Sequence, residues 1–284
     1  MGNHAAAIGA KLSRVDVVAA YPITPQTQSV ELLADMAAKG EFKGRFVLAD
    51  SEHSAMSMLL GAASAGARTF TSTSSQGLAY MHELLHWVAG SRLPAVMVEV
   101  NRALGAPWNL WTDQTDSLSQ RDTGWMQFYC ATSQEVLDTV IQAYRIAEKV
   151  QLPAMVVLDG FTLSHTYEPV DVPEQKDVDA YLPSYKPELI LDPDKPMAFG
   201  SLALPKEYFR LRRRIDYDMT QALSEVVSAG ADFKKRFGRS YGLFEEYQCQ
   251  DATTILVTAG AISMTAQEAV DSLRREGHRA GALR

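Results

Sequence analysis

The organisation of the chain is set by the stretch Phe46-Val47-Leu48-Ala49-Asp50-Ser51-Glu52-His53-Ser54. A short apolar run ends in an acidic cluster and passes into the small and apolar residues 55–63, which predicts a strand, a turn and a helix. Ser51 is the expected N-cap, so Glu52 falls in the first helical turn, at the carboxyl end of a strand. Ligands of open α/β sheets collect at this edge. A carboxylate in that place also complements the helix dipole, and this simpler role stays open from the spacing alone.

Length and composition limit the class of protein. The chain has 284 residues, enough for one full domain and part of another. Its net charge is −7 and no basic patch interleaved with aromatic residues is present, which argues against nucleic-acid binding. No apolar run reaches about 18 residues, so we expect no membrane span. The start, Met1-Gly2-Asn3-His4, lacks the basic and apolar regions of a secretory signal, and a cytoplasmic location is expected.

Cysteines and histidines give little support for a metal centre. Cys130 and Cys249 are far apart in sequence and are expected to be free, buried thiols of a reducing cytoplasm. No Cys-x-x-Cys run is present, so the chain itself is not expected to hold an iron–sulfur cluster. His82 and His86 are four residues apart and could share a helix face, but ordinary surface or core histidines are the stronger interpretation of that pair.

Strands and helices alternate over the first part of the chain. Apolar runs predict strands at residues 15–21, 46–50, 68–73, 93–100, 128–130 and 153–159. Helical patterns lie between most of them, including 79–89 and a helix through residue 150 that Ser133 is expected to cap. This alternation predicts an α/β fold with a doubly wound, mostly parallel sheet, occupying residues 1–168.

Two further strand ends carry candidate binding groups. The first strand ends in Tyr21-Pro22-Ile23-Thr24-Pro25, where two prolines pre-set the backbone. Thr24 or Thr27 can cap the next helix, and the loop is either a rigid turn or a platform that holds Thr24 toward a ligand. Arg102 follows the strand 93–100, on the same predicted edge as Thr24 and Glu52. Its guanidinium suits a carboxylate, and an interface salt bridge is an equal alternative.

The remaining segments suggest contacts with other chains. The loop from Trp108 to Arg121 contains two tryptophans and suits a subunit contact or an active-site wall. Residues 169–250 are predicted to be an extended arm and a helical linker, in which the Arg210–Arg214 run is a solvated or subunit-facing charge face. Residues 251–284 are predicted to begin a second α/β domain, which we expect to be truncated.

Four stretches in order resemble a known family. They are Tyr21-Pro22-Ile23-Thr24-Pro25, Ser51-Glu52-His53-Ser54, Ser75-Gln76-Gly77-Leu78, and Asp159-Gly160-Phe161 with Ser164-His165. Together they resemble the alpha subunit, or pyrimidine-binding region, of the pyruvate:ferredoxin oxidoreductase family of 2-oxoacid:acceptor oxidoreductases. The resemblance implies a thiamine-diphosphate pyrimidine-binding domain followed by a second domain of the transketolase C-terminal type.

The resemblance also implies residue roles. It makes Glu52 the carboxylate that bonds N1′ of the aminopyrimidine, where it favours the imino tautomer that takes the proton from thiazolium C2. It makes Thr24 and Arg102 the groups that contact the oxygens and carboxylate of a 2-oxoacid. Further cofactor-wall positions implied by the match are Tyr21, Pro22 and Gln76.

The departures from the family pattern imply partner chains. The chain has no Gly-Asp-Gly diphosphate and magnesium site and no cluster cysteines. The resemblance therefore implies that Mg²⁺ and the diphosphate site lie on a beta subunit, and that iron–sulfur clusters lie on other subunits, gamma and a ferredoxin-like delta subunit among them. It further implies coenzyme A as co-substrate and ferredoxin as electron acceptor.

The preferred hypothesis is an enzyme subunit that carries out oxidative decarboxylation of pyruvate with coenzyme A, giving acyl-CoA, CO₂ and reduced ferredoxin. Phenylglyoxylate, 2-oxoglutarate and branched 2-oxoacids remain open as substrates, because pocket walls decide differences of a methylene or a ring. The second hypothesis is a thiamine enzyme of the dehydrogenase or transketolase kind. The Tyr-Pro-Ile-Thr-Pro loop argues against it. A non-catalytic scaffold subunit with a vestigial site is the third.

Overall fold

A parallel six-stranded sheet forms the centre of the molecule. The computed structural model describes residues 1–284. The strands of the main sheet, all parallel, are β1 (Val17–Ala20), β2 (Arg45–Leu48), β3 (Thr69–Thr73), β4 (Val96–Asn101), β5 (Met126–Tyr129) and β6 (Ala154–Asp159). Their spatial order is β2-β1-β3-β4-β6-β5. The chain moves from β1 outward to β2 and then crosses back to β3, so the direction of winding reverses between β1 and β3. The prediction of a doubly wound α/β sheet is confirmed.

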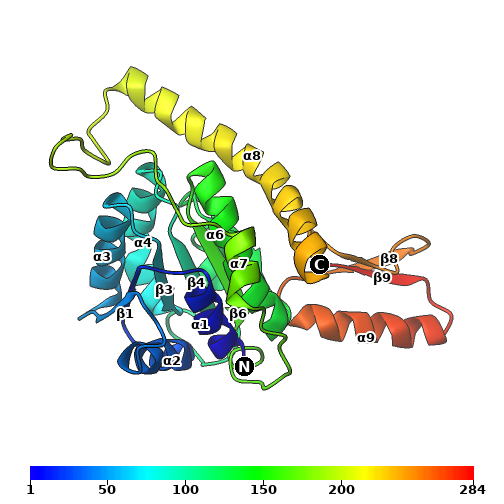
Figure 1. Cartoon of the computed structure of the whole chain (residues 1–284). Coiled ribbons are helices and arrows are strands. Elements are labelled where there is room, and N and C mark those ends of the chain that lie inside the picture. The colour runs from blue at the N-terminus through cyan, green and yellow to red at the C-terminus, as the bar shows by residue number, and fades with distance from the viewer.

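Helices cover both faces of this sheet (Figure 1). On one face lie α1 (Gly2–Leu12), α2 (Thr27–Ala38) and α6 (Ser133–Val150), and on the other lie α3 (Glu52–Ser64) and α4 (Gln76–Gly90). Successive residues of a strand face opposite sides. In β4, Val96 and Val98 accordingly pack into the first core and Met97 into the second. Every residue of the inner strands β3, β4 and β6 is buried, although β3 is rich in threonine and β4 contains Glu99.

The stretch 46–54 folds as expected from the sequence. The Ser51 hydroxyl accepts a hydrogen bond from the backbone N–H of Ser54 at 3.1 Å, which confirms Ser51 as the N-cap of α3. Glu52 is the first helical residue. The preceding strand β2 lies at the edge of the sheet, where Leu48 is 63% exposed.

Two expected helix caps are wrong. The helix α2 begins at Thr27 itself, so its N-cap is Gln26. The Gln26 side chain makes no capping bond. The Gln26 side chain instead reaches back into the loop that precedes it. The N-cap of α6 is Thr132 and not Ser133, since the Thr132 hydroxyl accepts from the Glu135 N–H at 3.1 Å.

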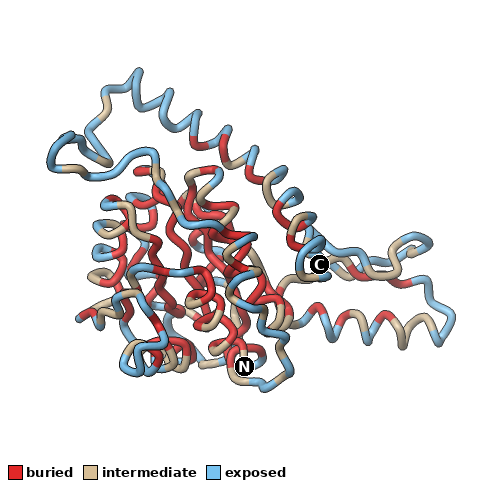
Figure 2. The backbone as a smooth tube through the Cα atoms, viewed as in Figure 1, coloured by how far each residue is buried: buried red, intermediate tan, exposed pale blue.

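The segment after β6 runs along the outside of the main body. It contains α7 (Gln175–Tyr181), whose Val178 and Tyr181 pack into the first core, and it reaches α3, where the Leu191 N–H donates to the Ser64 carbonyl at 2.8 Å. The long helix α8 (Pro205–Phe237) follows. The arginine run 210–214, assigned above to the arm and helical linker, lies inside α8. Figure 2 shows burial concentrated in the main sheet and much less of it along α8.

A second, small sheet lies at the far end of α8 (Figure 1). It consists of β7 (Glu246–Tyr247), β8 (Thr254–Val257) and β9 (Ala280–Leu283) in the order β7-β9-β8, with α9 (Ile262–Arg275) between β8 and β9. The β8–β9 pair is parallel and the β7–β9 pair antiparallel. The division of the chain at residues 168 and 250 stays a prediction; β7 precedes residue 251 and pairs with β9.

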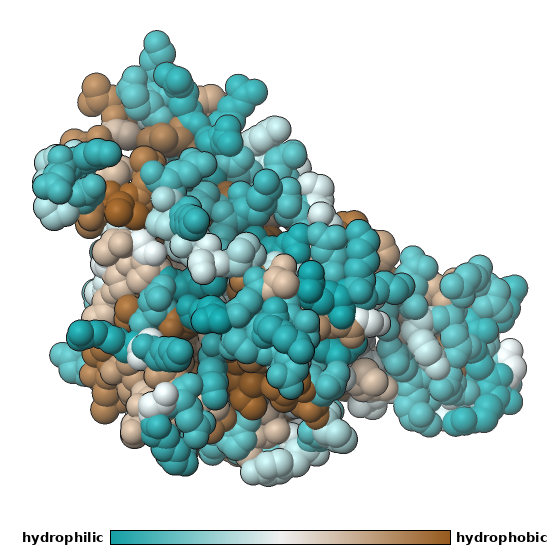
Figure 3. All heavy atoms as spheres, viewed as in Figure 1, coloured by the Kyte–Doolittle hydropathy of each residue, from teal (hydrophilic) through white to brown (hydrophobic).

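None of the helices combines the length and the apolar character needed to cross a bilayer. Apolar side chains nevertheless reach the surface in several places, one of them around the segment before α8 and its first turns (Figure 3). The exposed apolar residues of this region include Leu189, Leu191, Leu202, Leu204 and Phe209. Contiguous exposed apolar surface of this kind is typical of contacts with another protein.

Candidate active site

The residues selected from the sequence meet at the carboxyl edge of the main sheet. The Tyr21–Pro25 loop follows β1, Glu52 follows β2, Gln76 follows β3 and Arg102 follows β4. In a parallel sheet these strand ends lie on one side, and the crevice at the β1–β3 reversal is where ligands bind. The structure brings Thr24, Gln76 and Arg102 into direct contact.

Glu52 packs against the beginning of α4. Its side chain is 9% exposed, and no hydrogen bond or salt bridge within the chain engages its carboxylate. Gly77 allows this approach, because a Cβ at that position would lie 2.7 Å from Glu52 Oε1 and 2.9 Å from Glu52 Cγ. The carboxylate oxygens of Glu52 are not among the fully enclosed polar atoms that lack a partner, so they remain open to a ligand. The burial of this side chain next to a glycine therefore indicates a place for a ligand that offers a hydrogen-bond donor.

Arg102 is held from several directions. It is 8% exposed, its Nη1 donates to the Thr24 carbonyl at 2.7 Å, and its Nη2 donates to Gln76 Oε1. The guanidinium lies 5.3 Å from the ring centre of Trp108. Its Nε is buried and makes no hydrogen bond. Burial lowers the pKa of Arg102, and the charges of nearby carboxylates, including that of Glu52, partly raise it again. A fixed guanidinium with an unused donor suits an anionic ligand.

The loop after β1 is fixed by side chains from elsewhere in the fold. The Gln26 amide donates to the Ser72 carbonyl at 2.6 Å and to the Tyr21 carbonyl at 3.2 Å. The Asn3 amide donates to the Pro25 carbonyl at 2.7 Å. The Thr24–Pro25 peptide bond is cis. Within this rigid loop Tyr21, Pro22 and Thr24 stay exposed at the sheet edge, as a ligand platform requires.

The carboxyl end of β6 reaches the same edge. Gly160 passes so close to the Asn101 carbonyl that a Cβ would clash with it at 2.3 Å, and the Cβ would also lie 3.1 Å from Pro25 Cγ. Asp159 accepts a hydrogen bond from the Ala261 N–H at 2.5 Å, at the start of α9. Burial raises the pKa of Asp159, and bonds from Ala261 and Gln114 oppose this. Asp159 thus links the small sheet region to the site edge.

A buried carboxyl pair next to the backbone of Arg102 was not predicted from the sequence. Glu99 of β4 and Asp116 of α5 (Thr115–Leu118) both accept from the backbone N–H of Ser75. Glu99 carried a readable signal, because a charged residue in the middle of the apolar run 93–100 is seldom buried without a specific role. Asp116 carried none beyond its place in the tryptophan-rich loop.

The histidines and cysteines lie apart from this arrangement. His82 and His86 contact each other edge to face, with ring centres 4.9 Å apart, and His82 Nδ1 lies 2.6 Å from Gln120 Oε1. Cys130 and Cys249 are both free thiols; Cys130 is buried, whereas Cys249 is half-buried, contrary to the expectation that both are buried. Burial raises the pKa of the Cys130 thiol.

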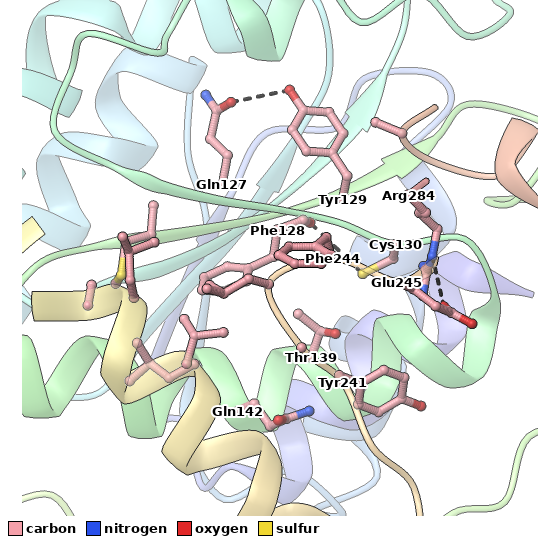
Figure 4. A pocket seen from close by; sticks show the side chains of 18 of the residues that line it. Gln127, Phe128, Tyr129, Cys130, Thr139, Gln142, Tyr241, Phe244, Glu245 and Arg284 are labelled. Atoms are coloured by element: carbon pink, nitrogen blue, oxygen red, sulfur yellow. Dashed lines mark hydrogen bonds and ion pairs between the residues drawn. The ribbon is translucent and has the colours of Figure 1, made fainter. Parts of the chain in front are cut away.

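A cavity of about 1080 Å³ lies elsewhere, between β5, α6 and α8. Figure 4 shows Phe128 and Cys130 on one face of β5 and Gln127 and Tyr129 on the other, and all four are among the residues that line the cavity. None of the site residues predicted from the sequence lines it. The candidate site is the strand-end arrangement and not this cavity.

Comparison with protein families finds one matching model. Residues 8–229 match the family described as pyruvate flavodoxin/ferredoxin oxidoreductase, thiamine diphosphate-binding. The chain is 49% identical over 284 residues to pyruvate synthase subunit PorA of Methanothermobacter thermautotrophicus, covering 99% of this chain and 74% of that protein. It is 51% identical over 282 residues to ketoisovalerate oxidoreductase subunit VorA of Pyrococcus horikoshii, covering 99% of this chain and 72% of that protein.

A solved structure shares the fold. The 2-oxoglutarate:ferredoxin oxidoreductase of Magnetococcus marinus, solved with 2-oxoglutarate, coenzyme A and succinyl-CoA, superposes with a TM-score of 0.75 at 22% identity. The match covers 99% of this chain and 52% of that chain, so the present chain spans about half of its length.

Proposed function

The chain belongs to the pyruvate flavodoxin/ferredoxin oxidoreductase family, thiamine diphosphate-binding, and from that premise we propose that it is the alpha-type subunit of a 2-oxoacid:ferredoxin oxidoreductase complex. The complex oxidatively decarboxylates a 2-oxoacid with coenzyme A, giving acyl-CoA, CO₂ and reduced ferredoxin. The observation that carries the proposal is the meeting of an unpartnered buried carboxylate, Glu52, and a fixed guanidinium, Arg102, at the β1–β3 reversal.

Glu52 is the proposed cofactor-binding and catalytic carboxylate. Thiamine diphosphate, when bound, supplies a nucleophilic carbon and an electron sink for loss of CO₂. The Glu52 carboxylate would hydrogen-bond N1′ of the aminopyrimidine and stabilise a proton there. The free carboxylate next to Gly77 fits this role, since it needs a donor that the chain does not provide. The exposed surfaces of Tyr21 and Pro22 and the side chain of Gln76 would form the cofactor wall.

Arg102 and Thr24 are the proposed substrate groups. The guanidinium would bind the carboxylate of the 2-oxoacid, and the Thr24 side chain would contact its oxygens. The Arg102 contacts with the Thr24 carbonyl and with Gln76 support this assignment, because they fix the guanidinium before the substrate arrives. A group fixed in advance loses less entropy on binding.

The diphosphate, Mg²⁺ and iron–sulfur clusters belong, in this proposal, to partner subunits. A beta subunit would hold the diphosphate and Mg²⁺, and gamma and ferredoxin-like delta subunits would complete the electron path. The names of the relatives as subunits and the exposed apolar region around the start of α8 support an assembly. A cytoplasmic location is part of the same proposal, supported by the free state of both cysteines.

Pyruvate is the first proposed substrate and a branched 2-oxoacid the second. The relative named for pyruvate and the relative named for ketoisovalerate are almost equally similar to the chain, at 49% and 51% identity. Phenylglyoxylate and 2-oxoglutarate are less favoured alternatives. A scaffold role with a vestigial site would leave unexplained why Gly77 makes room for the Glu52 side chain beside the fixed Arg102.

The test is reconstitution with candidate beta, gamma and delta subunits. Reduction of a viologen dye is followed as a function of pyruvate, 2-oxoisovalerate, phenylglyoxylate and 2-oxoglutarate, with and without coenzyme A. Glu52→Gln is compared with Glu31→Gln, a matched change at an exposed glutamate of α2. Coenzyme A-dependent activity that collapses only in Glu52→Gln is the expected result. Full activity in Glu52→Gln would instead favour the hypothesis of a scaffold subunit with a vestigial site.

A further inference from the structure

Two buried carboxyl groups lie directly beneath the proposed substrate arginine. Glu99 is 0% exposed and Asp116 is 1% exposed. The Ser75 N–H donates to both, at 3.0 Å to Glu99 Oε1 and at 3.1 Å to Asp116 Oδ2. Carboxyl groups that share a single donor are close enough to repel each other if both are ionised. Burial raises the pKa of Glu99 well above its usual range, and the charge of Asp116 adds to the effect. Burial raises the pKa of Asp116 as well, and the hydrogen bonds that it accepts oppose this rise. Because Asp116 accepts from four N–H donors and Glu99 from only one, we assign the proton of the pair to Glu99.

Asp116 connects the strand ends that carry the site. Its Oδ2 accepts from the backbone N–H of Arg102 at 2.8 Å as well as from Ser75. Its Oδ1 accepts from the Asn101 amide at 2.6 Å and from the Ser117 N–H at 2.8 Å. One carboxylate thus joins the end of β4 to the turn between β3 and α4. Four donors on one carboxylate stabilise its ionised form.

The turn at Ser75 needs such support. Ser75 has φ 50° and ψ −118°, a backbone conformation that residues other than glycine seldom adopt. Strain of this kind persists where surrounding contacts determine it, and it gathers at functional sites. The Ser75 hydroxyl also lies within hydrogen-bond distance of the Ala103 carbonyl, at 2.7 Å, and of Gln76 Oε1, at 2.5 Å, and its single proton can serve one of them at a time. The strained turn therefore directs Gln76 toward its contact with Arg102.

We propose that Asp116 and Glu99 are positioning residues that hold the Ser75 turn and the backbone of Arg102 in the arrangement that presents the guanidinium to the substrate carboxylate. This inference rests on the proposed function of Arg102. The pair touches neither substrate nor cofactor in this scheme. It acts through Arg102, and its single negative charge balances the guanidinium in a site removed from water.

The groups that face the pair are few. Glu99 pairs in register with Thr73 of β3 and Val157 of β6, neither of which is charged. The charge of Asp116, in α5, raises the pKa of Glu99, and the charge of Arg102, at the end of β4, lowers it. Burial raises the pKa of Tyr129 of β5, and the charges of both carboxyls and of Asp159 raise it further. A rise in pH that ionises Glu99 would place a second charge beside Asp116 and disturb the Ser75 turn.

The experiment compares Asp116→Asn with Asp113→Asn in the full chain assembled with its partner subunits. In Asp116→Asn either orientation of the amide sets an NH₂ group against two N–H donors. The Asp113 side chain caps only Thr115 in the same loop, which makes it a matched control. We expect the KM for the 2-oxoacid to rise about 10- to 100-fold in Asp116→Asn, with the KM for coenzyme A unchanged. A 2-oxoacid KM that stays at the wild-type value in Asp116→Asn overturns the proposal.

Glu99 provides a second readout if Asp116→Asn does not fold. Gln at position 99 can replace a protonated glutamate as donor and acceptor, whereas Leu cannot. We expect Glu99→Gln to retain most of the affinity for the 2-oxoacid, Glu99→Leu to lose it, and the increase in KM at alkaline pH in the wild type to be absent in Glu99→Gln. The same alkaline increase in Glu99→Gln would contradict the proposal.

Hydrogen exchange separates failure of this inference from failure of the proposed function. Peptides that contain Ser75 and Arg102 are expected to exchange faster in Asp116→Asn than in Asp113→Asn, whether or not the complex oxidises a 2-oxoacid. A wild-type complex without activity would refute the proposed function alone. Unchanged exchange in both peptides would refute the positioning role alone.

Discussion

Gly77→Ala is the sharpest test of how Glu52 is held. In most helices this change stabilises by up to about 1 kcal/mol, because alanine loses less backbone entropy and favours the helix. At position 77, however, the new Cβ would lie 2.7 Å from Glu52 Oε1 and 2.9 Å from Glu52 Cγ and would also clash with Thr73 Oγ1. Overpacking of this kind costs about 1–3 kcal/mol. The steric cost therefore exceeds the helix gain, and we expect a net destabilisation of up to about 2 kcal/mol.

The matched control is Gly61→Ala in α3. Nothing lies within 4 Å of a Cβ at Gly61, so the same substitution is expected to stabilise by about 0.5–1 kcal/mol. The two variants should shift the unfolding temperature of the full chain in opposite directions, by about 2–4 °C per kcal/mol for a chain of this size class. In the reconstituted complex, displacement of Glu52 in Gly77→Ala is expected to lower kcat/KM for the 2-oxoacid by about 100-fold. Stabilisation and full activity in both variants would refute the close packing of Glu52 on Gly77.

Three other perturbations test separate parts of the structure. Arg68, 3% exposed, bonds Glu148 through Nε and Nη2 at 2.5 and 2.9 Å, so Arg68→Met leaves that carboxylate buried and unpaired and should cost about 3–5 kcal/mol in urea unfolding. Addition of Glu148→Leu should recover most of the loss, and an undiminished loss in the double variant would refute the pairing. Burial and the Asp116 charge raise the pKa of Glu99 in the folded state, so the folded state binds more protons and stability falls as pH rises above the unfolded pKa of about 4.3. Glu99→Gln should flatten this decline in urea unfolding measured from about pH 4.3 upward, and an unchanged slope would show that Glu99 does not cause it. Ser51→Ala removes the cap of α3 and should cost about 1 kcal/mol, whereas Ser57→Ala, within the same helix on an exposed face, should cost much less; equal losses would argue against the cap.

The architecture and the site edge were readable because their signals are local. Apolar runs of strand length alternating with helical patterns predicted the parallel sheet, and Thr24, Glu52 and Arg102 were chosen because each follows such a run. The cofactor-wall residues Tyr21, Pro22 and Gln76 came from the family resemblance alone. Ser51 was predicted as a cap from its neighbours alone and is confirmed. The α2 cap was missed because Gln26 bonds Ser72, a residue 46 positions away. The α6 cap was misplaced by one residue, from Thr132 to Ser133, which is the usual error of boundary assignment.

The sequence by itself determined that Thr24, Glu52 and Arg102 share one edge, since the carboxyl ends of parallel strands always lie on the same side. Only the tertiary structure decided which of them touch. The order of the strands places the Arg102 guanidinium on the Thr24 carbonyl and on Gln76, and it buries the Glu99–Asp116 pair beneath them. Those contacts join segments far apart in the chain at distances near 3 Å. Periodicity along a sequence carries no information at that scale, because it fixes which side a residue faces and not what lies opposite it.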